Sequence, residues 1–390
     1  MYVNIAVLKE TQPRERRVAL VPSVVAKLTK LGGRVHMQCG AADAIQLPEA
    51  AYDGVVFLDD RRALVADADV VLAVQPPALA VIDAMKPGAI LISFVYAEQE
   101  PELVKSLLAR KITCFAMERI PRISRAQAMD ALSSQSALAG YYAVALGMTH
   151  MARVLPKITS AAGVIGPAKV LVMGLGVAGL EAIATAQRLG AVVEGYDIRP
   201  ATKEQALSLG ATFVDTGVDA TGKGGYARAL TTEEKTKVDA ALTKHIHASD
   251  LIITTAAIPG KASPKLISKA QVAGMKPGAV IVDLSAEGGG NCEVTEPGET
   301  IQVGEITIVA PLNVPSLLCA DASELLAKNQ FNLLTLMLKD NIISIDWTDE
   351  VLAKTALTHD GKLCETNHPN AGKAAATPPT KADKAAATAA

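Results

Sequence analysis

Aromatic side chains are scarce in this chain: Phe, Trp and Tyr together make up 3% of its 390 residues, although 50% of the residues are hydrophobic. A core must therefore be built from Ala, Val, Leu and Ile, which is typical of parallel sheets that helices cover on both faces. A chain of this length can hold two domains of ordinary size, each with its own core.

Other absences exclude further classes of protein. The five cysteines are scattered without a CxxC pair, which argues against a disulfide framework or a zinc site and favours a reducing compartment. The six histidines form no ligand pattern either, so we expect no metal. No apolar signal segment begins the chain, and no run of about eighteen apolar residues occurs. The net charge of −2 gives no electrostatic footprint for nucleic acid. These absences predict a cytoplasmic protein with no direct membrane span and no nucleic-acid partner.

Short apolar runs alternate with helical stretches in two series, one over residues 2–117 and one that begins at Lys169. This alternation predicts parallel strands and two doubly wound, Rossmann-like α/β domains joined by long helices. The expected strands are residues 3–8, 34–39, 69–74, 88–95 and 112–117 in the first series and 169–174, 191–197, 250–257, 278–286 and 306–310 in the second. The expected helices are residues 23–32, 101–110, 136–155, 179–189 and 323–339, and the expected loops are residues 156–169 and the Gly-rich, charged residues 217–237.

The expected domains are not continuous in the chain. The first takes residues 1–135 and about 321–368, since a late helix can return to it. The second takes residues 136–320, including the linking helix. The tail, residues 369–390, is an Ala/Pro/Lys segment of low complexity that cannot bury a core, so it is predicted to be disordered or a linker.

A glycine motif lies at the start of the second series. Gly174, Gly176 and Gly179 have the GxGxxG spacing, follow a predicted strand and open a predicted helix. The first glycine permits a tight turn, the second lets the backbone approach a pyrophosphate, and the third lets helix and strand pack closely. The next strand ends at Asp197, where a carboxylate can bond the ribose hydroxyls and repel a 2′-phosphate. The motif therefore predicts a dinucleotide site that prefers NAD(H), and a structural turn with a capping Asp is the alternative.

Neighbouring residues complete the expected cofactor site. Arg199 could serve a 2′-phosphate instead, which would reverse the preference. Thr254 and Thr255 follow a predicted strand at the edge where doubly wound sheets bind their ligands. The cofactor-binding residues expected beside the glycines and Asp197 are Val177, Ala178, Ile198, Arg199, Thr255 and Ala256.

A polar stretch, "PRISRAQAMDALSSQS" at residues 121–136, is too polar for a core and too varied for a linker. Together with "VLVMGLGVAGLEAIATAQRLGAVV", "RPATKEQ", "GGYA", "ITTAAIPGK" and "LSAEGGGNC", it resembles the NAD(H)-binding component (domain I, from the alpha subunit) of proton-translocating nicotinamide nucleotide transhydrogenase. That component belongs to the alanine dehydrogenase/transhydrogenase superfamily. The similarity runs from about residue 3 to about residue 368, and the tail is not covered.

The resemblance implies a role for the polar stretch as a loop that reaches the nicotinamide end of the cofactor cleft. Its residues there are Arg122, Gln127, Asp130 and Ser133. Hydride transfer between two nicotinamides requires close placement of the two C4 atoms rather than a general acid or base. Arg122 and Ser133 can bond a carboxamide, Gln127 can bond the ribose and the partner's cofactor, and Asp130 can pair with Arg122. A solvated loop with helix-capping Ser residues is the alternative.

The resemblance also implies the setting in which the chain works. Tyr226 resembles a family Tyr that closes over bound nucleotide, and simple lid packing is its alternative role. The chain would give hydride from NADH to NADP⁺ on a partner subunit, in a Re/Si-specific transhydrogenase coupled to proton translocation. Its implied partners are the NADP(H)-binding and membrane-spanning subunits and a second copy of itself. It would lie peripherally at the cytoplasmic face of the inner membrane.

Two other functions compete with this one. An alanine dehydrogenase would need proton-transfer groups, yet Gln75 and Tyr96 stand where that family has its substrate Lys and its His. Arg17 is kept, and it can hold a substrate carboxylate or make only a structural ion pair. A non-catalytic NAD-binding module is the other alternative, and the complete set of polar residues at 122, 127, 130 and 133 argues against it.

Overall fold

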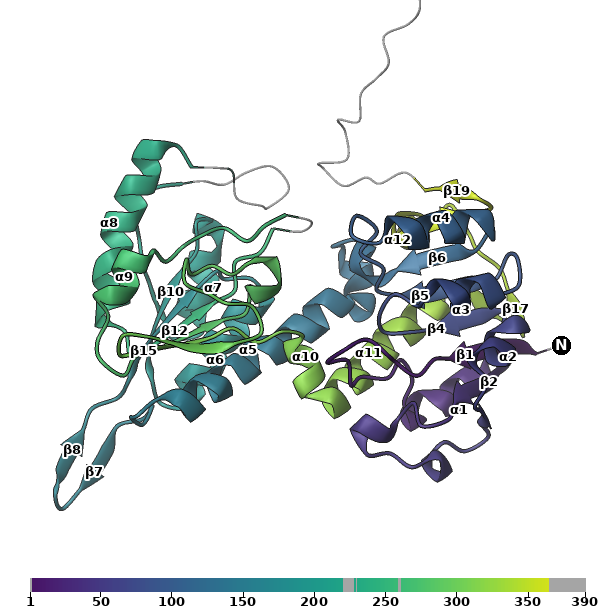
Figure 1. Cartoon of the computed structure of the whole chain (residues 1–390), viewed down its shortest axis with the longest axis horizontal. Coiled ribbons are helices and arrows are strands. Elements are labelled where there is room, and N and C mark those ends of the chain that lie inside the picture. The colour runs from purple at the N-terminus through teal and green to yellow at the C-terminus, as the bar shows by residue number, and fades with distance from the viewer. Residues whose placement is uncertain (1, 220–227, 229, 259–260, 365–390) are drawn as a thin grey trace, which may run out of the picture.

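The computed structural model describes residues 2–219, 228, 230–258 and 261–364, and these residues form two lobes, each built on one sheet (Figure 1). In the first lobe the described strands form an eight-stranded sheet of order β19-β18-β6-β5-β4-β1-β2-β3. Its strands are β1 (Val3–Val7), β2 (Gly33–Gln38), β3 (Val56–Leu58), β4 (Val70–Leu72), β5 (Ile90–Ser93), β6 (Thr113–Ala116), β18 (Ala356–His359) and β19 (Lys362–Leu363). β1 to β6 pair in parallel, and β18 and β19 add an antiparallel edge from the end of the described chain.

The second lobe holds a seven-stranded sheet, among the described residues, of order β11-β10-β9-β12-β13-β15-β14. Its strands are β9 (Lys169–Met173), β10 (Val192–Tyr196), β11 (Thr212–Phe213), β12 (Leu251–Thr254), β13 (Val280–Asp283), β14 (Thr300–Val303) and β15 (Ile306–Val309). β14 is antiparallel to β15, and the other pairs are parallel. The two sheets confirm the predicted fold class of two doubly wound α/β units.

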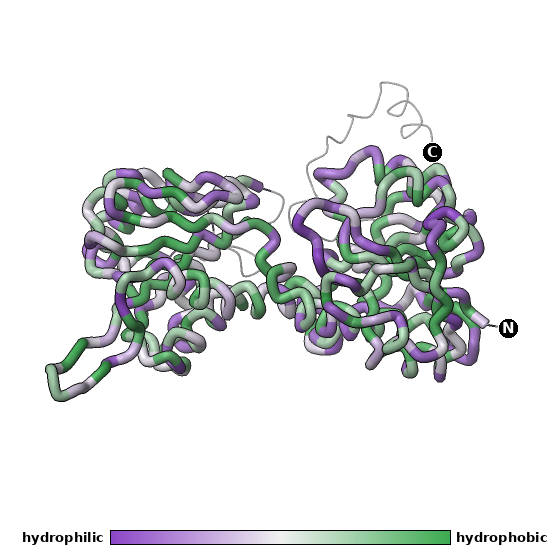
Figure 2. Tube along the Cα trace, turned by 60° about the horizontal axis from the view of Figure 1, so that its bottom comes forward, coloured by the Kyte–Doolittle hydropathy of each residue, from purple (hydrophilic) through white to green (hydrophobic). Residues whose placement is uncertain are grey.

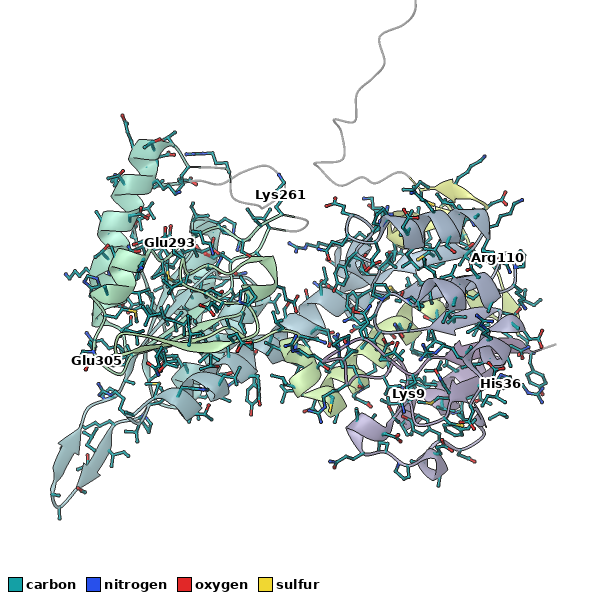
Figure 3. All side chains as sticks on the ribbon, in the orientation of Figure 1. Lys9, His36, Arg110, Lys261, Glu293 and Glu305 are labelled. Carbon is teal, nitrogen blue, oxygen red and sulfur yellow. The ribbon has the colours of Figure 1, made fainter. Side chains whose placement is uncertain are left out.

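Side chains alternate between the two faces of each sheet, because successive residues of a strand point to opposite sides. In β9, Val170 and Val172 join one buried cluster, whereas Leu171 and Met173 join the other. Figure 2 shows hydrophobic strands running through both lobes. Charged side chains such as Lys261, Glu293 and Glu305 lie on the outside (Figure 3). A core of aliphatic residues therefore fills both faces, as the composition predicts.

Helices cover both faces of each sheet. Those of the first lobe are α1 (Pro22–Lys30), α2 (Arg61–Ala66), α3 (Leu79–Ala84), α4 (Pro101–Ala109), α11 (Cys319–Leu334) and α12 (Glu350–Thr355). Those of the second are α6 (Val177–Arg188), α7 (Lys203–Ser208), α8 (Thr232–Ala248) and α9 (Lys269–Ala273). None of the helices in the described part of the chain has the length and apolar character needed to span a membrane.

The chain crosses between the lobes twice. The first crossing is the long helix α5 (Ala131–His150), and the second runs from the end of β15 through α10 (Val314–Leu317) into α11. α5 packs against α11 at one end and α6 at the other, and the crossings lie side by side between the lobes in Figure 1. A Cβ on Gly140 would overlap the carbonyl oxygen of Ala178, so α5 and α6 touch backbone to backbone. The first lobe is thereby tied to the start of α6, where the glycine motif lies.

Several expected elements differ in the structure. The predicted loop at 156–169 contains an antiparallel hairpin, β7 (Ile158–Ser160) and β8 (Gly163–Ile165), which projects from the second lobe. Its strands are exposed on both faces, so no alternation of burial marks them in the sequence. Strand β3 was also missed, because it is short and only partly buried.

Helix boundaries were also predicted incorrectly. The helix expected over 136–155 is α5, which runs from Ala131 to His150. The loop expected over 217–237 gives way to α8 at Thr232, where Thr231 and Glu234 form a capping box. The helix expected to reach residue 339 ends at Leu334 and is followed by a short hairpin, β16 (Leu338–Lys339) and β17 (Ile342–Ile343). The tail 369–390 lies outside the described residues, as does Tyr226.

Candidate functional site

The glycine motif forms the turn between β9 and α6. Gly174 has a φ of +94°, and a Cβ there would lie 2.8 Å from the backbone nitrogen of Ala256. A Cβ on Gly179 would overlap the carbonyl oxygen of Gly174, so that position also requires glycine. Gly176 is different, because no heavy atom lies within 4 Å of a Cβ built there. The turn thus leaves room at its middle glycine, next to the N-terminus of α6, which fits a bound pyrophosphate.

Asp197 follows β10 and is buried against this turn. Its Oδ2 accepts a hydrogen bond from the backbone N–H of Leu175 at 2.7 Å, which orients the glycine turn. Its Oδ1 accepts from the backbone N–H of Arg199 at 2.8 Å and from Arg199 Nε at 2.9 Å, and Arg199 Nη2 lies 2.8 Å from Oδ2. Asp197 therefore holds the turn, and Arg199 folds back onto its carboxylate. Ile198, between them in the chain, is half-buried.

The end of β12 contacts the turn from the other side. Thr255 Oγ1 donates to the carbonyl oxygen of Gly174 at 2.7 Å, and Ala256 N donates to Asn291 Oδ1 at 2.9 Å. Thr254 differs from its neighbour, because it is fully buried and donates to Asp283 Oδ1 at 2.9 Å. The structure thus places Thr255 and Ala256 at the turn but directs Thr254 into the sheet.

Two residues that support this edge were missed from the sequence. Asp283 Oδ2 accepts from the backbone N–H groups of Asn291 and Cys292 and from Thr295 Oγ1. Asn291 in turn donates to the carbonyl oxygens of Ala256 and Pro264. The sequence does hold one local indication, because an apolar strand there ends in the carboxylate of Asp283. A buried carboxylate needs hydrogen-bond donors around it, so a polar network at that strand end could have been expected.

The polar stretch folds into helix rather than into the expected loop. Residues Ser124–Met129 form a 3-10 helix, and Asp130 is the N-cap of α5. Asp130 accepts from the backbone N–H of Ser133 at 2.9 Å and from Ser133 Oγ at 2.6 Å. The structure thus joins Asp130 to Ser133 as a helix cap. The expected pairing of Asp130 with Arg122 is not among the contacts of the described residues.

Other residues of the stretch are either exposed to solvent or hold the stretch against the first lobe. Arg122 and Gln127 are exposed, whereas Ala126 and Met129 are buried beneath them. The side-chain amides of Asn329 and Asn332 on α11 both donate to the carbonyl oxygen of Ala128 at 2.9 Å. Arg122 and Gln127 are therefore presented on a fixed surface at the start of α5. The Gly140 contact with α6 lies ten residues along the helix, or about 15 Å.

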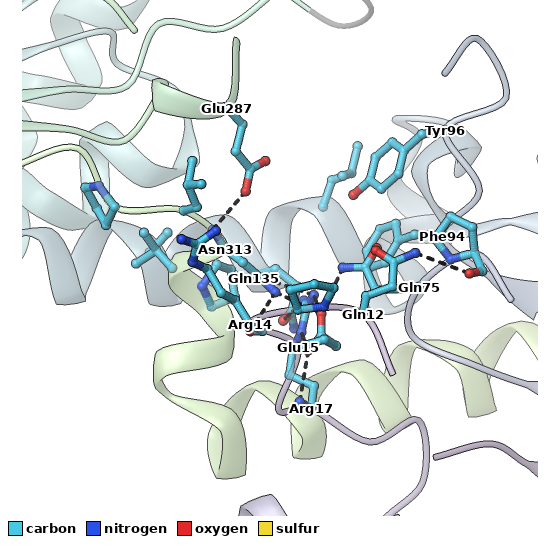
Figure 4. Close-up of a pocket in the computed structure, with 18 of the residues that line it drawn as sticks. Gln12, Arg14, Glu15, Arg17, Gln75, Phe94, Tyr96, Gln135, Glu287 and Asn313 are labelled. Atoms are coloured by element: carbon cyan, nitrogen blue, oxygen red, sulfur yellow. Dashed lines mark hydrogen bonds and ion pairs between the residues drawn. The ribbon is translucent and has the colours of Figure 1, made fainter. Parts of the chain in front are cut away.

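A cavity of about 470 Å³ opens between the lobes beside the start of α5 (Figure 4). Its volume falls in the range of small-molecule sites. Residues of the first lobe, of α5 and of the second lobe line it, among them Gln75, Tyr96, Leu132, Ser136 and Glu287. No Lys or His is among the described residues that line it.

Arg17 in this cavity makes a buried ion pair. Its Nε and Nη2 donate to the two oxygens of Glu15 at 2.8 and 2.6 Å, and its Nη1 donates to Gln135 Oε1 at 2.9 Å. Burial alone would raise the pKa of Glu15, but the bonds and charge of Arg17, together with a bond from Gln75, outweigh it and hold that pKa at about 2. Of the two roles left open for Arg17, the structure shows the ion pair.

The chain is similar in sequence to proteins of known activity over nearly its whole length. It is 44% identical to an NAD(P) transhydrogenase alpha-subunit polypeptide of Rhodospirillum rubrum, with 93% of this chain and 97% of that protein covered. It is 27% identical to an alanine dehydrogenase of Mycolicibacterium smegmatis, with 92% and 94% covered.

Solved structures and family models agree with these relatives. A transhydrogenase crystal structure from Sinorhizobium meliloti matches with a TM-score of 0.81 at 40% identity, covering 92% of this chain and 98% of that one. An L-alanine dehydrogenase structure shares the fold with a TM-score of 0.76 at 23% identity, covering 93% of this chain and 96% of that one. The family models described as "Alanine dehydrogenase/PNT, N-terminal domain" and "Alanine dehydrogenase/PNT, C-terminal domain" match residues 6–139 and 143–366. The family and its Rossmann-like fold imply binding of a nicotinamide dinucleotide. The chain therefore belongs to the alanine dehydrogenase/PNT family.

Proposed function

We propose that the chain is the NAD(H)-binding component of a proton-translocating, Re/Si-specific transhydrogenase, and that it presents the hydride of NADH to NADP⁺ on a partner subunit. The observation that carries the proposal is the pairing of an open glycine turn with a cleft that holds no Lys or His among its described lining residues. Reduction of an oxo acid with ammonia requires proton transfer, whereas transfer between nicotinamides does not. The high identity to transhydrogenase subunits supports the same choice.

The residues of the chain divide the work. The turn at Gly176 and the N-terminus of α6 bind the pyrophosphate, and the Asp197 carboxylate bonds the adenosine ribose and disfavours a 2′-phosphate. When bound, the nicotinamide supplies the hydride. Arg122 and Ser133 hold its carboxamide, and exposed Gln127 faces the partner's cofactor. Asp130 fixes Ser133 through the helix cap.

The assembly follows from the same proposal. The chain associates with an NADP(H)-binding subunit and a membrane-spanning subunit, and it lies peripherally on the cytoplasmic face of the inner membrane. It also pairs with a second copy of itself. The projecting hairpin supports this pairing, because Ile158, Val164 and Ile165 on it are exposed apolar side chains.

Calorimetric titration of the purified chain with NADH and with NADPH tests the cofactor preference. We expect selective binding of NADH and no NADH oxidation with pyruvate and ammonia. Adding a purified NADP(H)-binding transhydrogenase component should then produce hydride transfer. Oxidation of NADH by pyruvate and ammonia would instead identify a free-standing dehydrogenase, and binding without transfer in the mixture would identify a non-catalytic module.

A further inference from the structure

Glu15 is an unusually well-bonded carboxylate in the cavity between the lobes. Its side chain has no exposed surface, and it lies 2.6 Å from Arg17 Nη2. Its oxygens accept from the backbone N–H groups of Arg16 (3.1 Å) and Arg17 (2.9 Å), from Arg17 Nε (2.8 Å), Gln75 Nε2 (2.8 Å) and Asn313 Nδ2 (3.0 Å), and from the hydroxyl of Ser316 (3.1 Å). The carboxylate thus accepts from many donors, and those of Gln75, Asn313 and Ser316 come from distant parts of the chain.

The donors connect both crossings between the lobes to the first lobe. Arg17 reaches the first crossing, where its Nη1 donates to Gln135 on α5. Gln135 Nε2 in turn donates to the carbonyl oxygen of Ala322 on α11. Asn313 and Ser316 belong to the second crossing, at and just after the end of the second lobe. We call Glu15, Arg17, Gln75, Gln135, Asn313 and Ser316 the Glu15 cluster, and most of them are labelled in Figure 4.

Asn313 makes hydrogen bonds to both lobes and so connects the second lobe to this cluster. Its backbone N–H donates to Glu287 Oε1 in the second lobe at 2.8 Å, whereas its side chain donates to Glu15 and to the carbonyl oxygen of Arg14 in the first. Its φ of +47° is in the left-handed region, which costs a non-glycine residue energy. A strained residue with bonds to both lobes is placed where a hinge between them would bend.

We infer that the Glu15 cluster fixes the angle between the two lobes, so that Glu15 and Arg17 are positioning residues for hydride transfer. The inference rests on the proposed function. The polar stretch and the glycine turn, which that function assigns to the cofactor, lie on either side of this joint between the lobes, formed by the Glu15 cluster. A buried ion pair adds little net stability, but its directional bonds select one arrangement over others. A small error in the placement of a reacting group costs rate rather than affinity.

Two variants loosen the joint in different ways. Glu15→Gln replaces one acceptor oxygen by an NH₂ group, which then faces donors of Gln75, Asn313 or Arg17 instead of accepting from them. It also leaves the Arg17 guanidinium without its charge partner. Asn313→Gly removes only the side-chain bonds and relieves the left-handed backbone, so it should fold even if Glu15→Gln does not. Asp250→Asn is the matched control. Asp250 is also a buried carboxylate bonded to Lys169 N, Arg153 and Lys276, but all of these lie outside the joint, on the second lobe's side.

Pulsed electron resonance between nitroxides at Glu102 on α4 and Lys235 on α8 measures the arrangement of the lobes directly. Both positions are exposed, and the partly exposed Cys39 and Cys364 are replaced by Ser to prevent stray labelling. Labelled chain is diluted in excess unlabelled chain so that only distances within one chain are recorded. The measurement uses neither nucleotide nor partner, so its result is independent of the proposed function.

We expect one narrow distance distribution for the wild type and for Asp250→Asn, and a broader or shifted one for Glu15→Gln and Asn313→Gly. In the mixture with the NADP(H)-binding component, both variants should transfer hydride at least about tenfold more slowly, with NADH affinity changed less than about threefold. Distributions like the wild type in Asn313→Gly and in any folded Glu15→Gln would overturn the inference. Equal broadening in Asp250→Asn would overturn it too, since the effect would then be general destabilisation.

Discussion

At the scale of single residues, the Asp197 carboxylate has two roles. It orients the glycine turn through the Leu175 N–H, and it is proposed to bond the ribose of NADH. Asp197→Asn keeps an oxygen for the Leu175 N–H but removes the charge. We expect NADH affinity to fall by roughly tenfold to a hundredfold, since hydrogen bonds to charged groups contribute about 1.5–3 kcal/mol. The preference for NADH over NADPH should also shrink. Calorimetry with both nucleotides measures these changes.

Glu194→Gln is the control for that experiment, because it removes a carboxylate from the same strand, where it pairs with His245 at 2.8 Å. It should leave both affinities near those of the wild type. Unchanged NADH affinity in Asp197→Asn would mean that another group reads the ribose.

Gln127 is exposed on the 3-10 helix before α5, so it can act on the partner's cofactor without supporting the fold. Gln127→Asn withdraws the amide by one methylene. Hydride transfer should slow by at least about tenfold with NADH affinity within about twofold, because a positional error costs rate rather than binding. Stopped-flow transfer to NADP⁺ on the partner measures the rate. Ser124→Ala, an exposed change on the same turn, should transfer at the wild-type rate; equal rates in all three proteins would remove Gln127 from the mechanism.

At this scale the sequence indicated residues that belong to a motif and missed those that depend on tertiary contacts. Gly174, Gly179 and Asp197 could be placed because their spacing has a backbone cause, and the structure brings them together at one turn. Asn291 and Glu15 could not be found in this way. Their partners lie up to 301 positions away, as for Glu15 and Ser316, and no local pattern predicts such a bond.

At the element scale, the contact between α5 and α6 depends on Gly140. A methyl group there would overlap the Ala178 carbonyl, so Gly140→Ala must push the start of α6 away and move the glycine turn with it. We expect a loss of about 1–3 kcal/mol of stability from overpacking, partly offset by the better helix propensity of Ala, and at least about tenfold weaker NADH binding. Thermal unfolding and calorimetry test both. Gly166→Ala is the control, because a Cβ there meets nothing within 4 Å, and it should change neither the stability nor the NADH affinity. Unchanged NADH affinity in Gly140→Ala would show that α5 and α6 can move apart without disturbing the glycine turn.

Two half-buried carboxylates hold the ends of neighbouring strands in the first lobe. Glu10 accepts from the backbone N–H groups of Val74 and Gln75 after β4, and Glu118 accepts from those of Val95 and Tyr96 after β5. Burial raises the pKa of both, that of Glu10 to about 7. These carboxylates therefore place Gln75 and Tyr96 in the cavity, and Glu10 gives the fold a pH dependence near neutrality.

The sign of that dependence follows from the raised pKa. Folded Glu10 keeps a proton that the unfolded chain releases above about pH 4.5, so the wild type loses stability as the pH rises from about 4.5 to 7, by at most about 3 kcal/mol. Glu10→Gln resembles the protonated form and lacks this loss. Its thermal midpoint relative to the wild type should rise between pH 5 and 7 and level off above. The exposed Glu305→Gln should show a constant difference; a constant difference in Glu10→Gln would contradict the raised pKa.

Strands were predictable where their residues are apolar along the whole length. The inner strands of both sheets stand out because their residues are buried on both faces. The hairpin β7–β8 has no buried face, so its sequence carries no such signal. Helix α8 was hidden by its polar start, although its capping box was a usable local signal at Thr231 and Glu234.

At the scale of the whole molecule, fold class followed from the order of strands and helices, but the joint between the lobes did not. Strand order is limited by general rules of parallel sheets, whereas the angle between lobes is set by a few specific bonds such as those of Asn313. The same distinction separates the cofactor turn, which lies within one lobe, from the cavity, which exists only where both lobes meet.

The hairpin β7–β8 bears on the proposed pairing of two chains. It projects from the second lobe and exposes 60% of Val164 and 54% of Ile165, a surface that a second copy would cover. Val164→Asp puts a charge on that surface, and burying an unpaired charge is costly, so the dimer should weaken by at least about tenfold while the monomer remains folded. Sedimentation velocity over a range of concentrations measures the dissociation constant. Val192→Asp, an exposed apolar position at the start of β10, is the control and should sediment as the wild type does. A wild-type chain that stays monomeric, or a Val164→Asp dimer as tight as the wild type, would exclude the hairpin as the dimer contact.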